Sequence, residues 1–462
     1  MMLAASLMAG GARAQAGAVN ERVRLVTDET RRQAAPPSNY FDLAKQEENQ
    51  IDVGGWVTVT GLDFRDDDHN AKAPDTIRNV VIEDYRLWVG GEITDDLRFY
   101  LRGRKQNFDF STAAGVPQPD FKSQEDVDLD LGYIDWAFAK NFSLRAGRQF
   151  VYLGRALTLS ADLDGGGLTY ADGPWQHHAF VGTSISRDPN IDTSVVGFTK
   201  RTQDRDFYIA DTSYRFESGT RAYGYLMVQQ DASKSLSAAQ SKQDFHYDSV
   251  YGGVGAEGSL DQLLHYYAEF VYEGGNGLAD VPNKRISIDA NAFLGGLLWY
   301  PESNWHPLVS LEVAHGSGDA ARSSVTNTFG GKLTPTSDHN FLYFGSYDGG
   351  LALSPRLSNI NIVRLGYQVK PFPHEGRQLP GLLVGSKISE YWKDENNGVI
   401  SDPLATLATS YVGWGVDAFV GYKPFSDLSF LLQYGRFKPG NAYAAGAQDA
   451  TNRILLTSTL SF

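Results

Sequence analysis

The segment Leu97-Arg98-Phe99-Tyr100-Leu101-Arg102 places apolar side chains at its odd positions and both arginines at even positions. The segments at 57–60 and 85–89 alternate in the same way. A repeat of two residues is that of a β-strand, whose side chains point to opposite faces in turn. In a soluble sandwich the polar face contacts water, whereas in a membrane-spanning barrel the apolar face contacts lipid and the polar face lines a wet lumen.

Short and long connections alternate strictly between these segments, and this alternation favours the barrel. Short turns are expected at residues 94–96, 139–141, 172–173, 217–220, 259–262, 302–306, 371–378 and 423–427. Longer polar links are expected at residues 65–76, 110–124, 152–164, 185–204, 232–243, 275–283, 316–357, 393–406 and 438–450. Seventeen connections join eighteen strands, and an even count puts both chain ends on the side of the short turns. The sequence therefore predicts an all-β, antiparallel transmembrane β-barrel of 18 strands, with short periplasmic turns and long extracellular loops; 16 strands is the alternative.

The composition agrees with a barrel and excludes several other classes of protein. The chain has 462 residues, with 48 Gly, 24 Tyr and 25 Phe but only 4 Met and no Cys. Without cysteine there is no disulfide, no thiolate zinc site and no thiol nucleophile. No stretch reaches the roughly 18 apolar residues of a spanning helix. The net charge of −14 argues against a nucleic-acid partner.

The first fifty residues are expected to lie outside the barrel. Residues 1–16 have a short apolar core and end in Ala14-Gln15-Ala16, which is typical of a signal peptide and its cleavage site. Residues 17–50 are charged and are interpreted as a periplasmic leader, with a plug or a partner-docking arm as the alternative. The barrel is then residues 51–462, in the bacterial outer membrane, with both termini periplasmic.

The last strand carries a possible assembly signal. Ile454, Leu456, Leu460 and the terminal Phe462 share one face of residues 453–462. A strand that ends in an aromatic residue resembles the signal read by the outer-membrane barrel-assembly machinery, which is therefore an expected partner. Outer-membrane lipid and lipopolysaccharide are the expected surroundings.

Strand alternation also predicts which side chains line the lumen. Inward cations lower the electrostatic cost of moving a carboxylate through a narrow pore. Arginine suits this task because its planar fork holds a carboxylate with two hydrogen bonds. The candidate lining residues are Arg86, Arg98, Arg102, Arg104, Arg145, Arg364, Lys370, Tyr223 and Tyr225.

A purely structural role for the same residues stays open. Asp126, Asp128 and Asp130 lie on one face of the next strand, so the arginines at 98, 102 and 104 can form a cross-strand ladder with them. The inward tyrosines at 223, 225 and 267 can stack on sugar rings or simply pack.

No catalytic or metal-binding motif stands out in the sequence, and we expect neither an enzyme nor a cofactor. His177 and His178 are adjacent on a strand, so they face opposite ways and cannot chelate one metal ion. No nucleophile-elbow, zinc-protease or phosphate-loop motif is present. The acidic run at 66–68 either binds Ca²⁺, bridges lipopolysaccharide, or is a solvated loop, and a solvated loop is the favoured reading.

Several motifs, in this order, resemble those of the alginate-export family of outer-membrane proteins. They are Leu144-Arg145-Ala146-Gly147-Arg148-Gln149, Asp164-Gly165-Gly166-Gly167-Leu168-Thr169-Tyr170 with Asp172-Gly173-Pro174-Trp175, Ser317-Gly318-Asp319 with Thr328-Phe329 and Asp338-His339, and Tyr434-Gly435-Arg436-Phe437-Lys438-Pro439-Gly440. The resemblance implies a monomeric 18-stranded barrel that passes an acidic exopolysaccharide through an electropositive constriction. It also implies a periplasmic scaffold lipoprotein as partner, although the leader departs from the family pattern.

Four functions follow from these patterns, in decreasing order of support. The first is passive export of an anionic, alginate-like polysaccharide, and the second is an anion-selective porin for small solutes. The third is a barrel that forms a sleeve around a periplasmic partner protein, such as a lipoprotein or cytochrome, and the last is an outer-membrane hydrolase. The long link at 316–357 can fold inward, which favours a gated conduit over an open porin.

Overall fold

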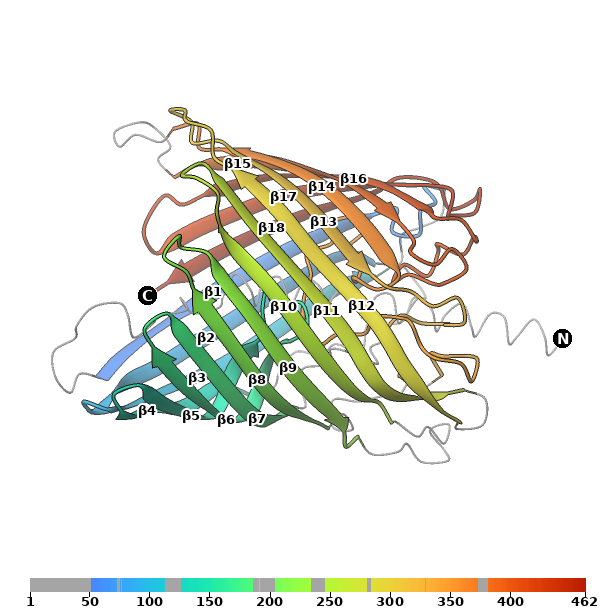
Figure 1. The fold of residues 1–462 in the computed structure, drawn as a ribbon. Helices are drawn as coiled ribbons and strands as arrows, with labels where there is room; N and C mark the ends of the chain where they lie inside the picture. The colour runs from blue at the N-terminus through green and yellow to red at the C-terminus, as the bar shows by residue number, and fades with distance from the viewer. Residues whose placement is uncertain are drawn as a thin grey trace.

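Eighteen antiparallel β-strands form one closed sheet in the computed structural model (Figure 1). The structure describes residues 51–72, 75, 77–112, 126–185, 191, 204–233, 246–280, 284–328, 330–372 and 381–462. The predicted fold class and strand count are therefore confirmed. The predictions for the signal peptide and the leader fall on residues 1–50, outside the described residues.

The strands follow the chain around the barrel, each pairing with its sequence neighbours. Their bounds are β1 (Ile51–Arg65), β2 (Ile77–Thr94), β3 (Leu97–Thr112), β4 (Asp128–Ala139), β5 (Phe142–Tyr152), β6 (Ser160–Asp172), β7 (Trp175–Ser184), β8 (Arg205–Arg215), β9 (Arg221–Asp231), β10 (Asp248–Ser259), β11 (Leu264–Ala279), β12 (Lys284–Trp299), β13 (Leu308–Gly316), β14 (Ile360–Val369), β15 (Leu383–Trp392), β16 (Tyr411–Tyr422), β17 (Leu428–Pro439) and β18 (Thr451–Ser461).

Pairing of the first and last strands closes the barrel. The register of β1 with β18 runs from Trp56 opposite Ser461 to Arg65 opposite Asn452. Gly55 and Phe462 exchange two backbone hydrogen bonds of 2.9 Å at the end of this seam. Closure leaves no unpaired edge, which is what a sheet surrounded by lipid requires. The C-terminus lies at the end of the barrel that carries the short turns (Figure 1), hereafter the short-turn end.

Two predicted links are shorter in the structure than in the sequence interpretation, because strands continue through polar and glycine-rich segments. β6 begins at Ser160, and the following polar residues belong to the barrel wall. β11 continues to Ala279 through Gly274, Gly275 and Gly277. Gly275 has φ +129, and a Cβ there would lie 2.1 Å from the carbonyl oxygen of Asp248. Glycine thus permits a close strand approach that the sequence alone suggested was a loop.

The outer face of the wall is apolar and carries an aromatic band. Leu87 is 63% exposed, whereas the neighbouring Arg86 is 3% exposed. At the short-turn end, ring centroids of Trp136, Phe138, Phe142 and Tyr170 follow one another at 5.4, 5.9 and 4.7 Å. Such a girdle is typical of a barrel at the membrane–water interface. Among the described residues there is no helix long and apolar enough to span a membrane.

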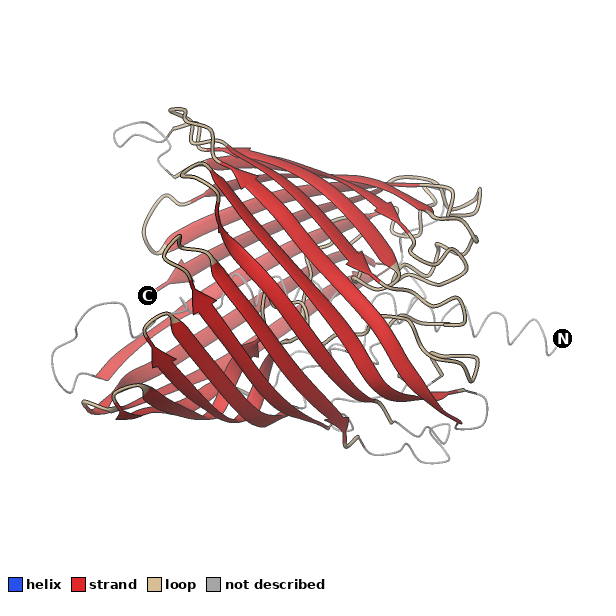
Figure 2. Ribbon diagram, in the orientation of Figure 1, coloured by secondary structure: helices blue, strands red, loops and turns tan. Residues whose placement is uncertain are grey.

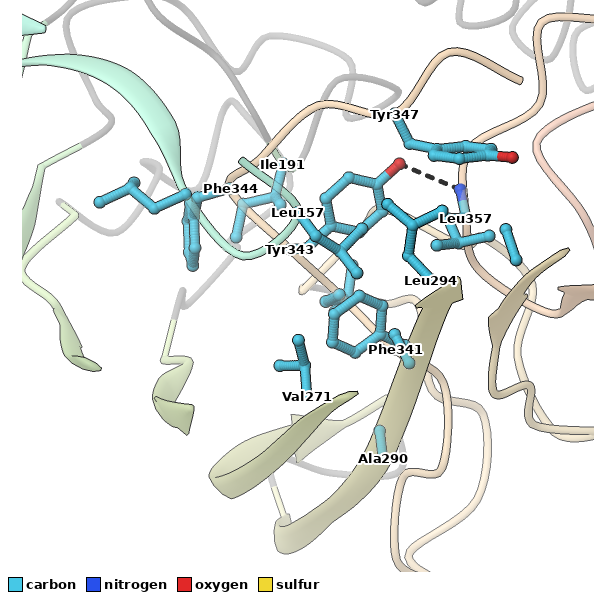
Figure 3. Close-up of a cluster of buried hydrophobic side chains, with 14 of the residues drawn as sticks. Leu157, Ile191, Val271, Ala290, Leu294, Phe341, Tyr343, Phe344, Tyr347 and Leu357 are labelled. Atoms are coloured by element: carbon cyan, nitrogen blue, oxygen red, sulfur yellow. Dashed lines mark hydrogen bonds between the residues drawn. The ribbon is translucent and has the colours of Figure 1, made fainter. Parts of the chain in front are cut away.

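Two of the long connections fold into the barrel, and loop segments are visible inside the strand wall (Figure 2). The first is residues 153–159, between β5 and β6, and the second is residues 317–359, between β13 and β14. They meet through a parallel bridge between Leu159 and Phe344, with Phe344 N donating to Thr158 O at 2.9 Å. Figure 3 shows the apolar cluster around them, where Leu157 of the first loop packs near Phe341 and Tyr343 of the second.

Candidate functional site

Three of the predicted lumen arginines form one buried ion network on the wall of β2, β3 and β4, hereafter the arginine wall. Asp84 accepts from Arg104 Nη2 at 2.6 Å and from Arg86 Nε at 3.1 Å. Asp130 accepts from Arg102 Nε at 2.6 Å, and Arg86 Nη1 lies 3.7 Å from it. All five side chains are buried. Three guanidiniums thus share two carboxylates, an arrangement that stabilises the wall but leaves little freely exposed positive charge.

Two further predicted arginines are half-exposed and lie nearer the short-turn end. Arg98 Nε is 3.0 Å from Glu92 Oε1. Arg145 makes a two-pronged pair with Asp135, at 2.8 Å for each bond, and its guanidinium lies 4.4 Å from the centroid of Tyr133. Half-exposed pairs of this kind contribute about 1 kcal/mol or less.

Arg364 and Lys370, both placed on β14 by the sequence, have different positions. Arg364 is buried, and its Nη1 lies 3.2 Å from Glu312 Oε1. Lys370 follows the end of β14, is exposed in the turn, and donates its backbone N–H to Trp305 O at 2.8 Å. The strand ends one residue too early for Lys370 to be part of the spanning wall, so it sits at the rim.

The predicted lumen tyrosines are engaged in holding the first inward loop. Tyr223 and Tyr225 each donate to Glu269 at 2.7 Å. The backbone N–H of Arg155 also donates to Glu269, at 2.6 Å. Tyr225 shares a further 2.6 Å hydrogen bond with Thr158 of the same loop. These rings therefore face inward but act as anchors, since their hydroxyls have protein partners.

A second buried carboxylate holds the second inward loop in the same way. Glu273 accepts from the hydroxyls of Tyr247 and Tyr251, and from the backbone N–H of Leu342 at 2.8 Å. The Tyr251 hydroxyl also lies 2.8 Å from the carbonyl oxygen of Leu342, so its single proton is shared between that oxygen and Glu273. Residues on β10 and β11 thus fix both hydrogen-bonding groups of one loop residue.

The far end of this loop is fixed on β13 to β16. Tyr347 donates to Glu312 at 2.9 Å, and the N–H of Leu351 donates to Asp417 at 3.2 Å. Asp348 accepts from Lys387 Nζ at 2.9 Å. Burial by itself would raise the pKa of Asp348, but the charges of Lys387 and Arg364 outweigh burial and hold that pKa below its usual range. We call this surface, from β9 to β16, the anchoring wall.

Below the first loop lies a polar cavity of about 660 Å³. It lies between β5 and β10 near the short-turn end, and Leu153 and Gly154 of the first loop are among its lining residues. Its charged lining residues are Arg145, His178, Asp211, Arg215, Arg221 and Glu257.

Most of the charged lining side chains in this cavity have partners. Arg221 Nη1 lies 3.2 Å from Glu257, which also pairs with Arg155 Nη1 at 2.9 Å. His178 Nδ1 lies 2.9 Å from Asp211. Arg215 is exposed at the rim of the cavity, directly opposite Arg221 in the β8–β9 hairpin. Two adjacent guanidiniums at a mouth favour binding of an anion.

A family comparison shows what kind of protein this lumen belongs to. The family model described as alginate export matches residues 50–456. The chain belongs to the alginate export family. No curated protein matches it. Family and fold together make the chain a bacterial outer-membrane β-barrel of the channel-forming kind, for export or porin-like transport.

Solved structures with the same fold are distant in sequence. OccK9 (OpdG) of Pseudomonas aeruginosa is 15% identical with a TM-score of 0.56, over 90% of this chain and 98% of that one. OpdK of the same organism, crystallised with vanillate, is 13% identical with a TM-score of 0.53, over 89% and 99%. The outer membrane protein OpdK in a separate crystal structure is 12% identical with a TM-score of 0.53, over 89% and 99%. At these identities the likeness concerns the fold alone.

The family-like Ser317-Gly318-Asp319 motif opens the second inward loop and acts structurally there. Ser317 Oγ donates to the carbonyl of His339 at 2.7 Å. Asp319 pairs with Lys332 and accepts from the N–H of Ala321 at 2.8 Å. The motif therefore shapes the loop of an alginate export protein at the point where it leaves β13.

The two adjacent histidines of β7 lie on opposite faces of the wall and have separate hydrogen-bond partners. His177 lies outside the barrel and bonds Thr212 at 2.9 Å, whereas His178 lies inside with Asp211. Over the described ranges, no group of three or more acidic or histidine side chains is arranged to hold a metal ion.

Sequence reasoning missed Arg155, Arg215 and Arg221. Arg215 and Arg221 flank the turn between β8 and β9. Arg221 shares the inward parity of Tyr223, and Arg215 lies opposite Arg221, so strand alternation could have placed both in the lumen. Arg155 is in a loop, so no alternation could place it.

Proposed function

We propose that this alginate export protein passes an anionic, alginate-like exopolysaccharide passively out of the periplasm through its lumen. The observation that carries the proposal is the polar cavity at the short-turn end, where Arg145, Arg215 and Arg221 line one space beside the first inward loop. Family membership supports the same function class. We place the short-turn end, and both termini, in the periplasm.

The ion pairs at this mouth would bind a polyuronate weakly enough for it to enter and to leave. The Arg145–Asp135 and Arg221–Glu257 pairs are partly exposed, so a substrate carboxylate can replace the protein carboxylate at small cost. Arg215 adds a positive charge at the rim. A row of weak, exchangeable sites conducts, whereas one tight site would block.

The experiment is single-channel recording with polymer added at the short-turn end. Oligouronates should interrupt the current, whereas uncharged dextran of equal length should not. An Arg215→Ala/Arg221→Ala double variant should show rarer interruptions, since both substitutions lower attraction at the mouth without breaking the Arg155–Glu257 pair. Equal block by dextran would overturn the proposal.

Passage of small anions is a second candidate, favoured by the bridge between the two inward loops at Leu159 and Phe344. The same loops would then limit the size of the solute that can pass. Liposome efflux separates the two functions: a conduit for polymer releases long uronate chains, whereas a small-solute porin retains them and releases only monomers.

Two partners belong to the same proposal. Phe462 is 67% exposed at the seam, where the barrel-assembly machinery would read it. A periplasmic scaffold lipoprotein would dock on the short-turn rim, and co-purification from membranes tests both contacts.

A further inference from the structure

A groove of about 530 Å³ lies over β6 to β9, and eight of its eleven lining residues have the lipid-facing parity, whereas His178, Asp211 and Tyr225 are inward-facing neighbours of these in the sequence. Its floor consists of Ala179, Ala210 and Gly224, where the wall lacks large side chains. Leu168 on one side and Leu226 on the other form its walls. The register confirms this geometry, because Leu168, Ala179, Ala210 and Leu226 are successive cross-strand partners.

One end of the groove is polar and aromatic. Two residues closer to the short-turn end, His177 is the cross-strand partner of both Tyr170 and Thr212. His177 Nδ1 and Thr212 Oγ1 are 2.9 Å apart. The His177 ring stacks between Tyr170 at 6.0 Å and Trp175 at 5.7 Å. This ring belongs to the aromatic girdle, so the polar pair lies at the depth of lipid headgroups.

We propose that this groove binds one glycerophospholipid of the inner leaflet, with an acyl chain over Ala179 and Ala210 and the phosphate at His177. The polarity of the groove follows that of an amphiphile, from a hydrogen-bonding end at the girdle to an apolar end toward the membrane centre. The outer face of the barrel contacts lipid, so the occupant comes from the bilayer. The Thr212 hydroxyl lies 2.9 Å from His177 Nδ1 and the His177 side chain is exposed, so a lipid phosphate would approach its Nε2. The choice of a phospholipid rests on the proposed periplasmic position of the short-turn end, and it does not depend on what the lumen conducts.

Native mass spectrometry of the delipidated, full-length barrel titrated with phosphatidylethanolamine tests the proposal. The wild type should retain one lipid per barrel. Ala210→Leu fills the groove and should lower retention at least about tenfold. His177→Phe keeps the ring stack but removes the hydrogen bond, and should lower retention about five- to tenfold. Ala268→Leu, at an exposed outward position on β11, is the matched control and should bind like wild type.

Other outcomes overturn the proposal. Equal retention by wild type and Ala210→Leu would show that no groove site exists. If wild type retained diacylglycerol as well as the phospholipid, the site would not recognise the phosphate. Preferential binding of lipid A would assign the site to the other leaflet. Heat-modifiable migration on gels shows whether each variant folds. If Ala210→Leu does not fold, the comparison of wild type with His177→Phe tests the proposal.

Discussion

The arginine wall and the anchoring wall both bury charged side chains inside one barrel, but their carboxylates have different partners. On the arginine wall, Asp84 and Asp130 accept from guanidiniums of the same wall. On the anchoring wall, Glu269 and Glu273 accept from tyrosine hydroxyls and from the backbone of loops that enter the lumen. The first arrangement joins strands to one another, and the second joins strands to loops. The difference implies that barrel stability and channel opening can be changed separately.

The largest expected effect is on the arginine wall. Asp130→Ala leaves the guanidiniums of Arg102 and Arg86 without their shared carboxylate, and breaking a buried ion pair on one side costs about 3–5 kcal/mol. The free energy of unfolding in detergent, measured by denaturant titration, should fall by that amount. Asp135→Ala removes the half-exposed partner of Arg145 and should cost about 1 kcal/mol or less. Equal losses for the two variants would mean that burial does not distinguish these pairs.

The next effect is on the anchoring wall. Glu273→Gln keeps the shape of the side chain but turns an amide NH₂ group toward a set of three donors, including the N–H of Leu342. Since a buried donor left unpaired costs about 1–3 kcal/mol, the loop should detach locally.

Limited proteolysis within 317–359 should accelerate in Glu273→Gln, and single-channel conductance should rise. Glu257→Gln, at the rim cavity, is the control and should leave the loop resistant to protease. A closed, resistant loop in Glu273→Gln would show that this carboxylate is not an anchor.

A smaller effect is expected where the loop passes close to β15. Gly350 has φ +110, and a Cβ at this position would lie 2.6 Å from the hydroxyl oxygen of Tyr391. Gly350→Ala should therefore destabilise the seated loop by about 1–3 kcal/mol and increase fluctuations of the current. Gly446→Ala has open space around it and should behave like wild type. Unchanged current in Gly350→Ala would argue that the loop is not seated here during conduction.

The smallest effect is on pH dependence. Burial would raise the pKa of Asp319, but the hydrogen bonds from Lys332 and the N–H of His339 outweigh it and lower that pKa. A depressed pKa contributes stability that is present above the ordinary aspartate value, about 3.9, and is lost as the pH falls through the folded value. Protease resistance of the loop should therefore decrease below about pH 4, and Asp319→Asn should flatten this dependence. A loop whose resistance in wild type is the same at pH 3 and pH 7 would contradict the role of this pair.

Strand count and wall polarity were predictable from the sequence, because a period of two and alternating turn lengths are local properties. The partners of the arginines were only partly predictable. Asp130 does pair with Arg102, but a register shift between Arg102 and Gly103 changes the ladder, and Arg104 instead pairs with Asp84 of β2. Loop contacts such as Leu342 with Glu273 join residues 69 positions apart, and no local pattern encodes them.

The most direct test of the account is the reversal potential in a salt gradient, for wild type and for Arg215→Ala/Arg221→Ala. The wild type should be anion-selective, and selectivity should fall in the double variant while the free energy of unfolding changes by about 1 kcal/mol or less per substitution. Cation selectivity of the wild type would contradict the account. A double variant that loses stability but keeps its selectivity would contradict it as well, because these arginines would then be structural.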